Sequence, residues 1–196
     1  MIQAGEVMES SFVGHEFRLS GHRFSVVRSA RRTDDGSLRI EYFAPPRENI
    51  SEHVHPRQEE SFEVISGTLG VRVGDRSLIL KPGQSAVGPP GIPHTWWNDG
   101  EEEVCFLAGI RPGLEVEVML ETVLGLMREG KTVGPIPRNP LQLAVLAREI
   151  GSWAHPTGIP VPARKALFAP VALLASVGER LGYRASYPEY GDPETR

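Results

Sequence analysis

The chain has 196 residues, of which 40% are hydrophobic and 23% are charged, and these proportions are typical of a soluble globular protein. A formal net charge of -4 argues against a nucleic-acid-binding protein. The single cysteine, Cys105, excludes a disulfide within the chain and fits a reducing compartment. The N-terminus lacks the basic start and apolar run of a signal peptide, so we expect a cytoplasmic protein.

Short strand-like segments separated by turn residues fill the first two-thirds of the chain. The expected strands are 23–28, 38–43, a segment at His53, a segment at Glu60, 70–73, 76–80, 85–88 and 104–110. Gly74-Asp75, between two of these segments, is a two-residue hairpin signal. Many short strands with regular turns predict a β-sandwich or a closed barrel.

Helical periodicity replaces the strand pattern after Gly113. Three helices are predicted, over residues 114–129, 141–150 and 163–181. Asn139 is a favourable N-cap for the second helix, and Pro170 predicts that the third helix is kinked or restarted. We therefore divide the chain into a β domain, residues 1–112, and a helical extension, residues 113–196, packed on the barrel or at a subunit interface.

The segments beside the third helix have less regular patterns. Residues 154–162 form a Pro/Gly linker in which His155 is expected at the surface, and the tail from Tyr187 to Arg196 is expected to be extended or frayed. The nearly uncharged run 166–178 is too short, and too interrupted by Pro and Gly, to span a bilayer, which takes roughly 20 apolar residues. Packing on the barrel or at an interface is its expected role; contact of residues 163–181 with a membrane surface, or a lid over the barrel mouth, is the alternative.

Three histidines and one glutamate have the types and the spacing of a metal site: His53, His55, Glu60 and His94. His53 and His55 are two residues apart, so on a strand both rings point to the same face. Imidazole is a common ligand for zinc, copper, iron and nickel, and a carboxylate adds negative charge. The set predicts one divalent metal ion.

Glu60 is a better candidate ligand than its neighbour Glu59. Glu60 shares one strand face with Phe62 and Val64, and this more apolar face is expected to point to the core. A buried carboxylate is costly unless it is paired or bound to a metal. Pro56 marks the place where the strand phase can reset between His55 and Glu60.

The sequence around these residues resembles two motifs of the cupin superfamily. Residues 53–67, HVHPRQEESFEVISG, resemble the first motif, and residues 83–98, GQSAVGPPGIPHTWWN, match the second. The defined positions of the second motif are Gly83, Pro89, Gly91, His94 and Asn98. One departure is Arg47, because the family pattern often has a glycine there. The resemblance covers about residues 36–112.

This resemblance implies a mainly β fold, the cupin barrel (a double-stranded β-helix or jelly roll), here followed by C-terminal α-helices. It implies a homodimer, and one divalent transition metal held by His53, His55, Glu60 and His94. Iron, manganese, nickel, copper, cobalt and zinc all suit these ligands, so the ligands do not fix the metal.

Three kinds of function are open to such a site, because cupins host many unrelated activities. The leading one is a dioxygenase-like, oxygen-dependent oxidoreductase acting on a small organic molecule. The alternatives are a metal-dependent isomerase or lyase and a non-catalytic small-molecule-binding or sensing cupin. Glu60 is the candidate catalytic residue, as a metal ligand that also serves as a transient base.

Four further residues are candidates for the substrate pocket. Phe62 and Val64 share the inward phase of Glu60, Trp96 shares the phase of His94, and Tyr42 lies on a neighbouring predicted strand. Trp96 offers a stacking surface and Tyr42 a hydroxyl donor. A tryptophan in a barrel is more often simply part of the core, and the alternative for Tyr42 is a place at the barrel edge with its hydroxyl in water.

Overall fold

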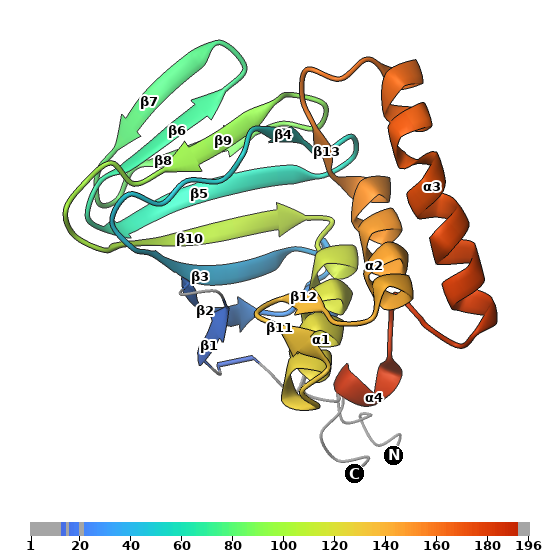
Figure 1. Cartoon of the computed structure of the whole chain (residues 1–196). Helices are drawn as coiled ribbons and strands as arrows, with labels where there is room; N and C mark the ends of the chain where they lie inside the picture. The colour runs from blue at the N-terminus through green and yellow to red at the C-terminus, as the bar shows by residue number, and fades with distance from the viewer. Residues whose placement is uncertain (1–12, 15, 20–21, 192–196) are drawn as a thin grey trace, which may run out of the picture.

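Two antiparallel β-sheets face each other, and helices from the C-terminal third lie along one side of them (Figure 1). The computed structural model describes residues 13–14, 16–19 and 22–191. The first sheet has the order β1 (Glu16–Leu19), β2 (His22–Arg28), β3 (Leu38–Ala44), β10 (Val104–Arg111), β5 (Glu59–Ser66), β8 (Ser85–Gly88). The second has the order β13 (His155–Pro156), β4 (His53–Val54), β9 (His94–Trp97), β6 (Leu69–Val73), β7 (Arg76–Leu80).

The main core lies between the two sheets. Phe62 and Val64 of β5 and Phe106 of β10 meet Val71 of β6 and Trp96 of β9, and each is at most 5% exposed. This packing confirms the predicted mainly β fold. Within the described residues the hydrogen-bonded ladders form two facing sheets rather than one closed sheet.

Helix α1 (Leu114–Arg128) is fixed to the β-sheets by a buried carboxylate as well as by apolar contacts. Leu120 packs in a cluster with Phe24 of β2. Glu117 is fully buried and accepts hydrogen bonds from the Ser29 hydroxyl and the Ala30 amide, both at 2.6 Å. Since its oxygens are satisfied, the charge is tolerated there. Ser29 and Ala30 precede and begin the short 3-10 helix Ala30–Arg32.

The remaining elements follow α1 along the chain. They are the strands β11 (Thr132–Val133) and β12 (Ile136–Pro137) and the helices α2 (Pro140–Trp153), α3 (Val161–Arg180) and α4 (Pro188–Gly191). The Asn139 side chain accepts a hydrogen bond from the Leu141 amide at 2.9 Å, which confirms the predicted N-cap. The Gly74-Asp75 hairpin between β6 and β7 is also confirmed.

Two predictions about the C-terminal region are wrong, and one alternative of a third is excluded. α2 does not end at Ile150 but continues to Trp153. α3 runs through Pro170 as one helix, so the predicted restart there does not occur. The tail is helical at Pro188–Gly191, because Tyr190 packs into the cluster formed by α1 and α2. Residues 192–196 lie outside the described part.

The predicted linker also contains a strand that the sequence pattern does not indicate. In β13, His155 pairs with Val54 and Pro156 with His53 of β4. The C-terminal extension therefore adds a strand to the second sheet, next to the candidate metal ligands. Helices α1 to α4 all follow residue 112, but the two parts of the chain share a sheet and a core.

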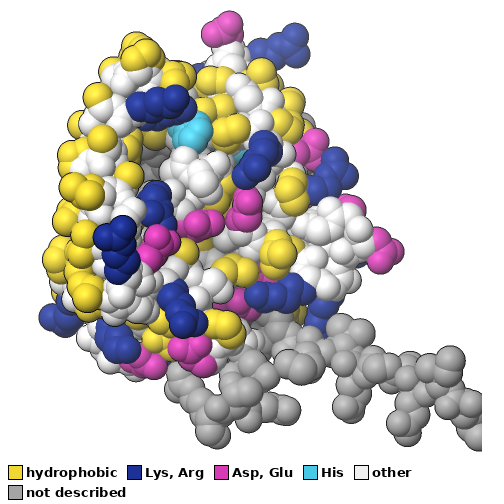
Figure 2. All heavy atoms as spheres, turned by 90° about the vertical axis from the view of Figure 1, so that its right-hand side faces the viewer, with side chains coloured by type: hydrophobic (Ala, Val, Ile, Leu, Met, Phe, Trp, Pro, Cys, Tyr) yellow, Lys and Arg dark blue, Asp and Glu magenta, His cyan; other side chains and the backbone are white. Residues whose placement is uncertain are grey.

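Helix α3 carries an unusual amount of exposed apolar surface. Leu167, Leu173 and the C-cap residue Leu181 are 62%, 68% and 67% exposed, and Figure 2 shows hydrophobic side chains over much of the side where α3 lies. The complete helix has 20 residues and a mean hydropathy of 1.3 over an 18-residue window, enough by length and composition to cross a membrane. The sequence-based prediction that this region is too short to span a bilayer considered only residues 166–178. One such helix is weak evidence for a span.

Arg47 stands out in the backbone. It has φ 65°, the left-handed region that residues with a Cβ enter at a cost of roughly 1–2 kcal/mol. The position at which the cupin pattern often has glycine is thus one that favours glycine. The turn forms with arginine in place, and the Arg47 guanidinium pairs with Glu101.

Candidate metal centre

Four side chains converge at one end of the space between the two sheets. The candidate ligand atoms of His53, His55, Glu60 and His94 all lie within 4.8 Å of one another. The Glu60 carboxylate oxygen is 2.9, 3.3 and 3.5 Å from Nε2 of His94, His55 and His53. Ligands about 2.1 Å from a single ion would be separated by distances of this order. The predicted residues are thus brought together as a set.

The second nitrogen of each imidazole is held by a backbone carbonyl. Nδ1 of His53 faces the Ser51 oxygen at 3.0 Å, Nδ1 of His55 the Trp153 oxygen at 2.9 Å, and Nδ1 of His94 an oxygen of the same loop at 2.8 Å. A carbonyl only accepts hydrogen bonds, so each Nδ1 carries a proton and donates it. Each neutral ring then directs the Nε2 lone pair to the centre, as metal-binding histidines do.

The candidate ligands come from both sheets. His53 of β4 pairs directly with His94 of β9, so both rings come from the second sheet. Glu60 of β5 comes from the first sheet, where it pairs with Gly88 of β8. A Cβ at Gly88 would lie 2.9 Å from the His94 ring, so a side chain there would displace His94.

The electrostatics of the cluster are dominated by the single carboxylate. Burial alone would raise the pKa of Glu60, but its interactions with the imidazoles of His53, His55 and His94 outweigh it and hold that pKa well below its usual range. Burial opposes protonation of His53, yet its hydrogen bond and charge interaction with Glu60 raise its pKa above the usual value. A proton on Nε2 of His53 would place a positive charge 3.5 Å from the Glu60 carboxylate.

A cavity of about 410 Å³ opens beside the cluster and is walled in part by the C-terminal extension. His53, His55 and Glu60 line it, together with the apolar side chains of Ile50, Ile110, Ile150, Trp153 and Pro156. The Trp153 ring lies parallel to the His55 ring, with 5.9 Å between centroids and an interplanar angle of 11°. The cavity thus combines polar metal-site residues with an apolar wall.

The side chains predicted to line the substrate pocket lie elsewhere. Phe62, Val64 and Trp96 are in the closed core between the sheets, and Tyr42 packs against the Trp96 ring at 5.3 Å with its hydroxyl 3.4 Å from Glu48. These four side chains point to the same side of their strands as the ligands do, but they lie in the core, beyond the cavity. Of the four, Phe62 comes nearest the ligands, with its ring 6.3 Å from that of His94.

The residues missed from the sequence belong to the segment that ends α2 and forms β13. Ile150, Trp153 and Pro156 wall the cavity, and His155 lines it instead of lying apart at the surface. An isolated tryptophan before a Pro/Gly segment is the one local signal that marks this region. Asn98, a defined position of the second motif, holds its loop: its Nδ2 donates to three backbone carbonyls.

The family profile of the cupin domain matches residues 41–110, the part that contains all four candidate ligands. The chain belongs to the cupin superfamily. Helices α1, α2 and α3 and strand β13 lie outside the matched part of this cupin.

Three known proteins are similar to parts of this chain. A probable oxidoreductase of Hypocrea virens, virH, is 26% identical over 163 residues, which are 73% of this chain and 70% of that protein. CurC of Streptomyces cyaneus, named a polyketide synthase, is 34% identical over 67 residues, which are 34% of this chain and 44% of CurC. A conserved protein from Klebsiella pneumoniae with a double-stranded β-helix domain has 31% identity, with 51% of this chain and 75% of that chain covered and a TM-score of 0.40.

Proposed function

We propose that this cupin binds one divalent transition metal and is an oxygen-dependent oxidoreductase acting on a small organic molecule. The observation that carries the proposal is the convergence of three imidazole Nε2 atoms and one carboxylate oxygen beside an open cavity. Three neutral nitrogens and one negative oxygen suit a divalent transition ion. A closed, purely structural site would leave no cavity beside the ligands.

The similarity to a probable oxidoreductase, which extends over 73% of the chain, supports the choice of reaction class. When bound, the metal would supply Lewis-acid polarisation of a substrate oxygen and, for iron, manganese or copper, electron transfer with dioxygen.

The chain's own residues would bind and orient the substrate. The cavity of about 410 Å³ is large enough for one small molecule. Ile50, Ile110 and Ile150 offer an apolar wall to the part of the substrate away from the metal. Trp153, 7% exposed, keeps water from the outer side of the His55 ring. These contacts would leave the polar end of the substrate directed at the ligand cluster.

Glu60 is proposed as both ligand and proton acceptor. Its pKa is well below the usual range, so it is ionised at neutral pH, which is the form that binds a metal; in the proposed base role it would take a proton from a substrate hydroxyl. A Glu60→Gln variant keeps the shape but loses the charge and basicity. We expect it to lose metal affinity and turnover together; full metal affinity with full turnover would count against this role.

Oxygen uptake tests the reaction class. Protein reconstituted separately with iron, manganese, copper and zinc would be assayed in an oxygen electrode with a panel of small enediols, diphenols and hydroxy acids. We expect substrate-dependent oxygen consumption with a redox-active metal, none with zinc, and none for the His94→Ala variant. Substrate turnover with zinc and without oxygen consumption would contradict the proposal and point to an isomerase or lyase.

A further inference from the structure

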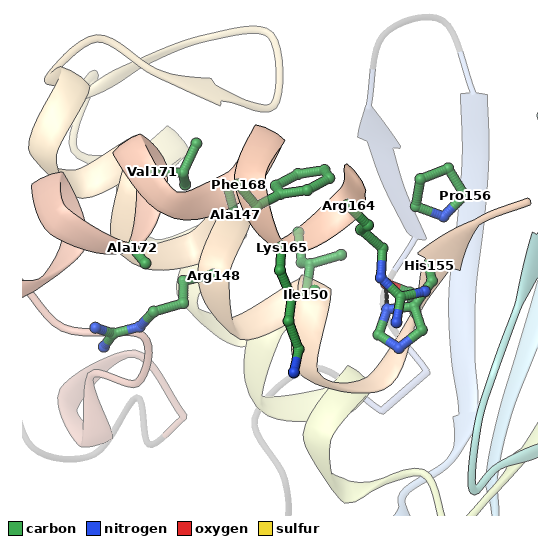
Figure 3. Close-up of a pocket in the computed structure, with 12 residues that line it drawn as sticks. Ala147, Arg148, Ile150, His155, Pro156, Arg164, Lys165, Phe168, Val171 and Ala172 are labelled. Carbon is green, nitrogen blue, oxygen red and sulfur yellow. Dashed lines mark hydrogen bonds between the residues drawn. The ribbon is translucent and has the colours of Figure 1, made fainter. Parts of the chain in front are cut away.

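A second cavity, of about 460 Å³, lies between helices α2 and α3 (Figure 3). The two helices are in close contact where Gly178 of α3 meets Leu141 and Val145 of α2; a Cβ at Gly178 would lie 3.0–3.3 Å from their atoms. The groove lies between the second half of α2 and the first half of α3, where Ile150 and Phe168 line it. Its size is within the range of small-molecule sites.

The groove is apolar along its length and positively charged at one end. Ile150, Phe168 and Val171 form apolar walls, while Arg164 and Lys165 stand near the start of α3. Figure 3 shows Arg164 reaching from α3 to His155. Within the described part of the chain, no Asp or Glu lines the groove, and no ion pair joins Arg164 or Lys165 to a carboxylate.

The position of these cations on α3 adds to the unbalanced positive charge. Arg164 and Lys165 lie near the N-terminus of the helix, which has no acidic residue in its first turn, and cations there oppose the helix dipole. An anion at this end would relieve that repulsion. Arg148, the third basic residue of the groove, is already paired with Glu179.

The groove adjoins the metal cavity. Ile150, Ala154, His155 and Pro156 line both. Of this shared wall, His155 and Pro156 form β13, which pairs with β4 and its ligand His53. A molecule in the groove would therefore lie against the segment that also shapes the candidate metal centre.

We propose that the α2–α3 groove binds an amphipathic organic anion, with its apolar body between Ile150 and Phe168 and its carboxylate at Arg164 and Lys165. Two sources share this chemistry: the anionic arm of the substrate itself, or a separate ligand next to the substrate. Only the first rests on the proposed oxidoreductase function. The groove residues lie outside the cupin-domain match, so this site belongs to the C-terminal extension.

Calorimetric titration with decanoate tests the site in the full chain, with and without bound metal. We expect binding in both forms. The double variant Arg164→Gln/Lys165→Gln should weaken it at least about tenfold, because it removes the charge-assisted hydrogen bonds. Arg180→Gln, which removes an exposed cation of the same helix outside the groove, should change the affinity less than about twofold.

Two results would overturn the proposal. One is equal decanoate affinity in the double variant and the wild type. The other is binding that requires the metal, because the carboxylate would then occupy the metal centre. Since binding is measured in metal-free protein, failure to find oxygen chemistry leaves this test intact.

The visible absorption of cobalt-substituted protein separates the two sources. A spectral change on saturation with decanoate indicates a ligand that reaches the metal cavity, as a substrate would. Saturation without a change indicates a separate ligand. Both results are consistent with binding in the groove and differ only in which source the ligand represents.

Discussion

The backbone carbonyls that face the three Nδ1 atoms determine the protonation of the metal-free cluster. With Nδ1 protonated, the only site for a further proton is Nε2, which is also the metal-binding atom. The pKa of His53 is raised because Glu60 stabilises the imidazolium. A proton and a metal ion therefore compete for the same atom.

Metal affinity should consequently fall as the pH falls. His53 is protonated below its raised pKa, which lies above the usual 6.5, while Glu60 stays ionised because its pKa is lowered. In the metal-free protein the charged pair stabilises the fold below the unfolded-state pKa of His53, and this stabilisation is lost as the pH rises through the folded-state pKa. Between pH 8 and pH 6 we expect zinc affinity to fall by up to about tenfold per pH unit, measured by competition with a chelator. An affinity independent of pH would contradict this account of His53.

Arg47 provides a prediction about stability. Arg47→Gly should raise the free energy of unfolding by about 0.5–1 kcal/mol, because the relief of left-handed strain exceeds the added entropy of the unfolded chain. Urea denaturation would measure it. Arg47→Ala is the control: it also removes the exposed ion pair with Glu101 but keeps a Cβ, so no gain is expected. A destabilised glycine variant, or an equal gain in both, would refute the strain argument.

At the scale of elements, local patterns predicted most strands, the helix α1 and the start of α2. The ligand set could also be predicted, because His53, His55 and Glu60 are close together in one sequence motif and His94 lies in a second local motif. The end of α2 and strand β13 could not: the hydrogen bond from His55 to Trp153 joins residues 98 positions apart. Such contacts leave no periodic signal in the sequence. The inward strand phase also does not say where a cavity ends and the core begins, which is why Phe62 and Val64 were assigned to the pocket.

Trp153, the last residue of α2, contacts the candidate ligand His55 through both its backbone carbonyl and its ring. Trp153→Ala should lower metal affinity about tenfold or more, because the backbone and ring that orient His55 lose their packing, and should cost about 3–5 kcal/mol of stability. Trp153→Phe keeps a ring against His55. It loses no hydrogen bond within the described structure, since the buried indole N–H has no partner there, so a smaller effect on both is expected.

Metal titration and urea denaturation of both variants check these values. Unchanged metal affinity in Trp153→Ala would show that α2 has no part in the centre.

The whole molecule is a β-sandwich whose C-terminal extension is joined to it by a strand, a helix and a cluster of buried residues. The extension leaves one apolar stripe uncovered on α3. Leu167, Leu174 and Leu181 are seven residues apart and 62%, 45% and 67% exposed, the spacing at which one helix contacts another along its length. The homodimer implied by the cupin resemblance stays a prediction, and this stripe is where we expect it.

Leu174→Glu tests that prediction by sedimentation velocity. We expect a dimer for the wild type and a monomer for the variant, with the same far-ultraviolet circular dichroism, because a charge in the stripe opposes helix pairing. Ile79→Glu changes another exposed apolar residue, 60% exposed on β7, and should leave the dimer intact. A monomeric wild type, or a dimer that survives Leu174→Glu, would contradict the assignment.

The central claim is that His53, His55, Glu60 and His94 form one metal site, and metal analysis tests it most directly. Protein purified without added metal or nickel affinity steps would be analysed by mass spectrometry, next to His94→Ala and His155→Ala. We predict one transition-metal ion per chain in the wild type, retention in His155→Ala, which changes a histidine outside the cluster, and loss in a folded His94→Ala protein. Wild-type protein that holds no metal even after reconstitution, or a His94→Ala variant that holds as much as the wild type, would contradict the account.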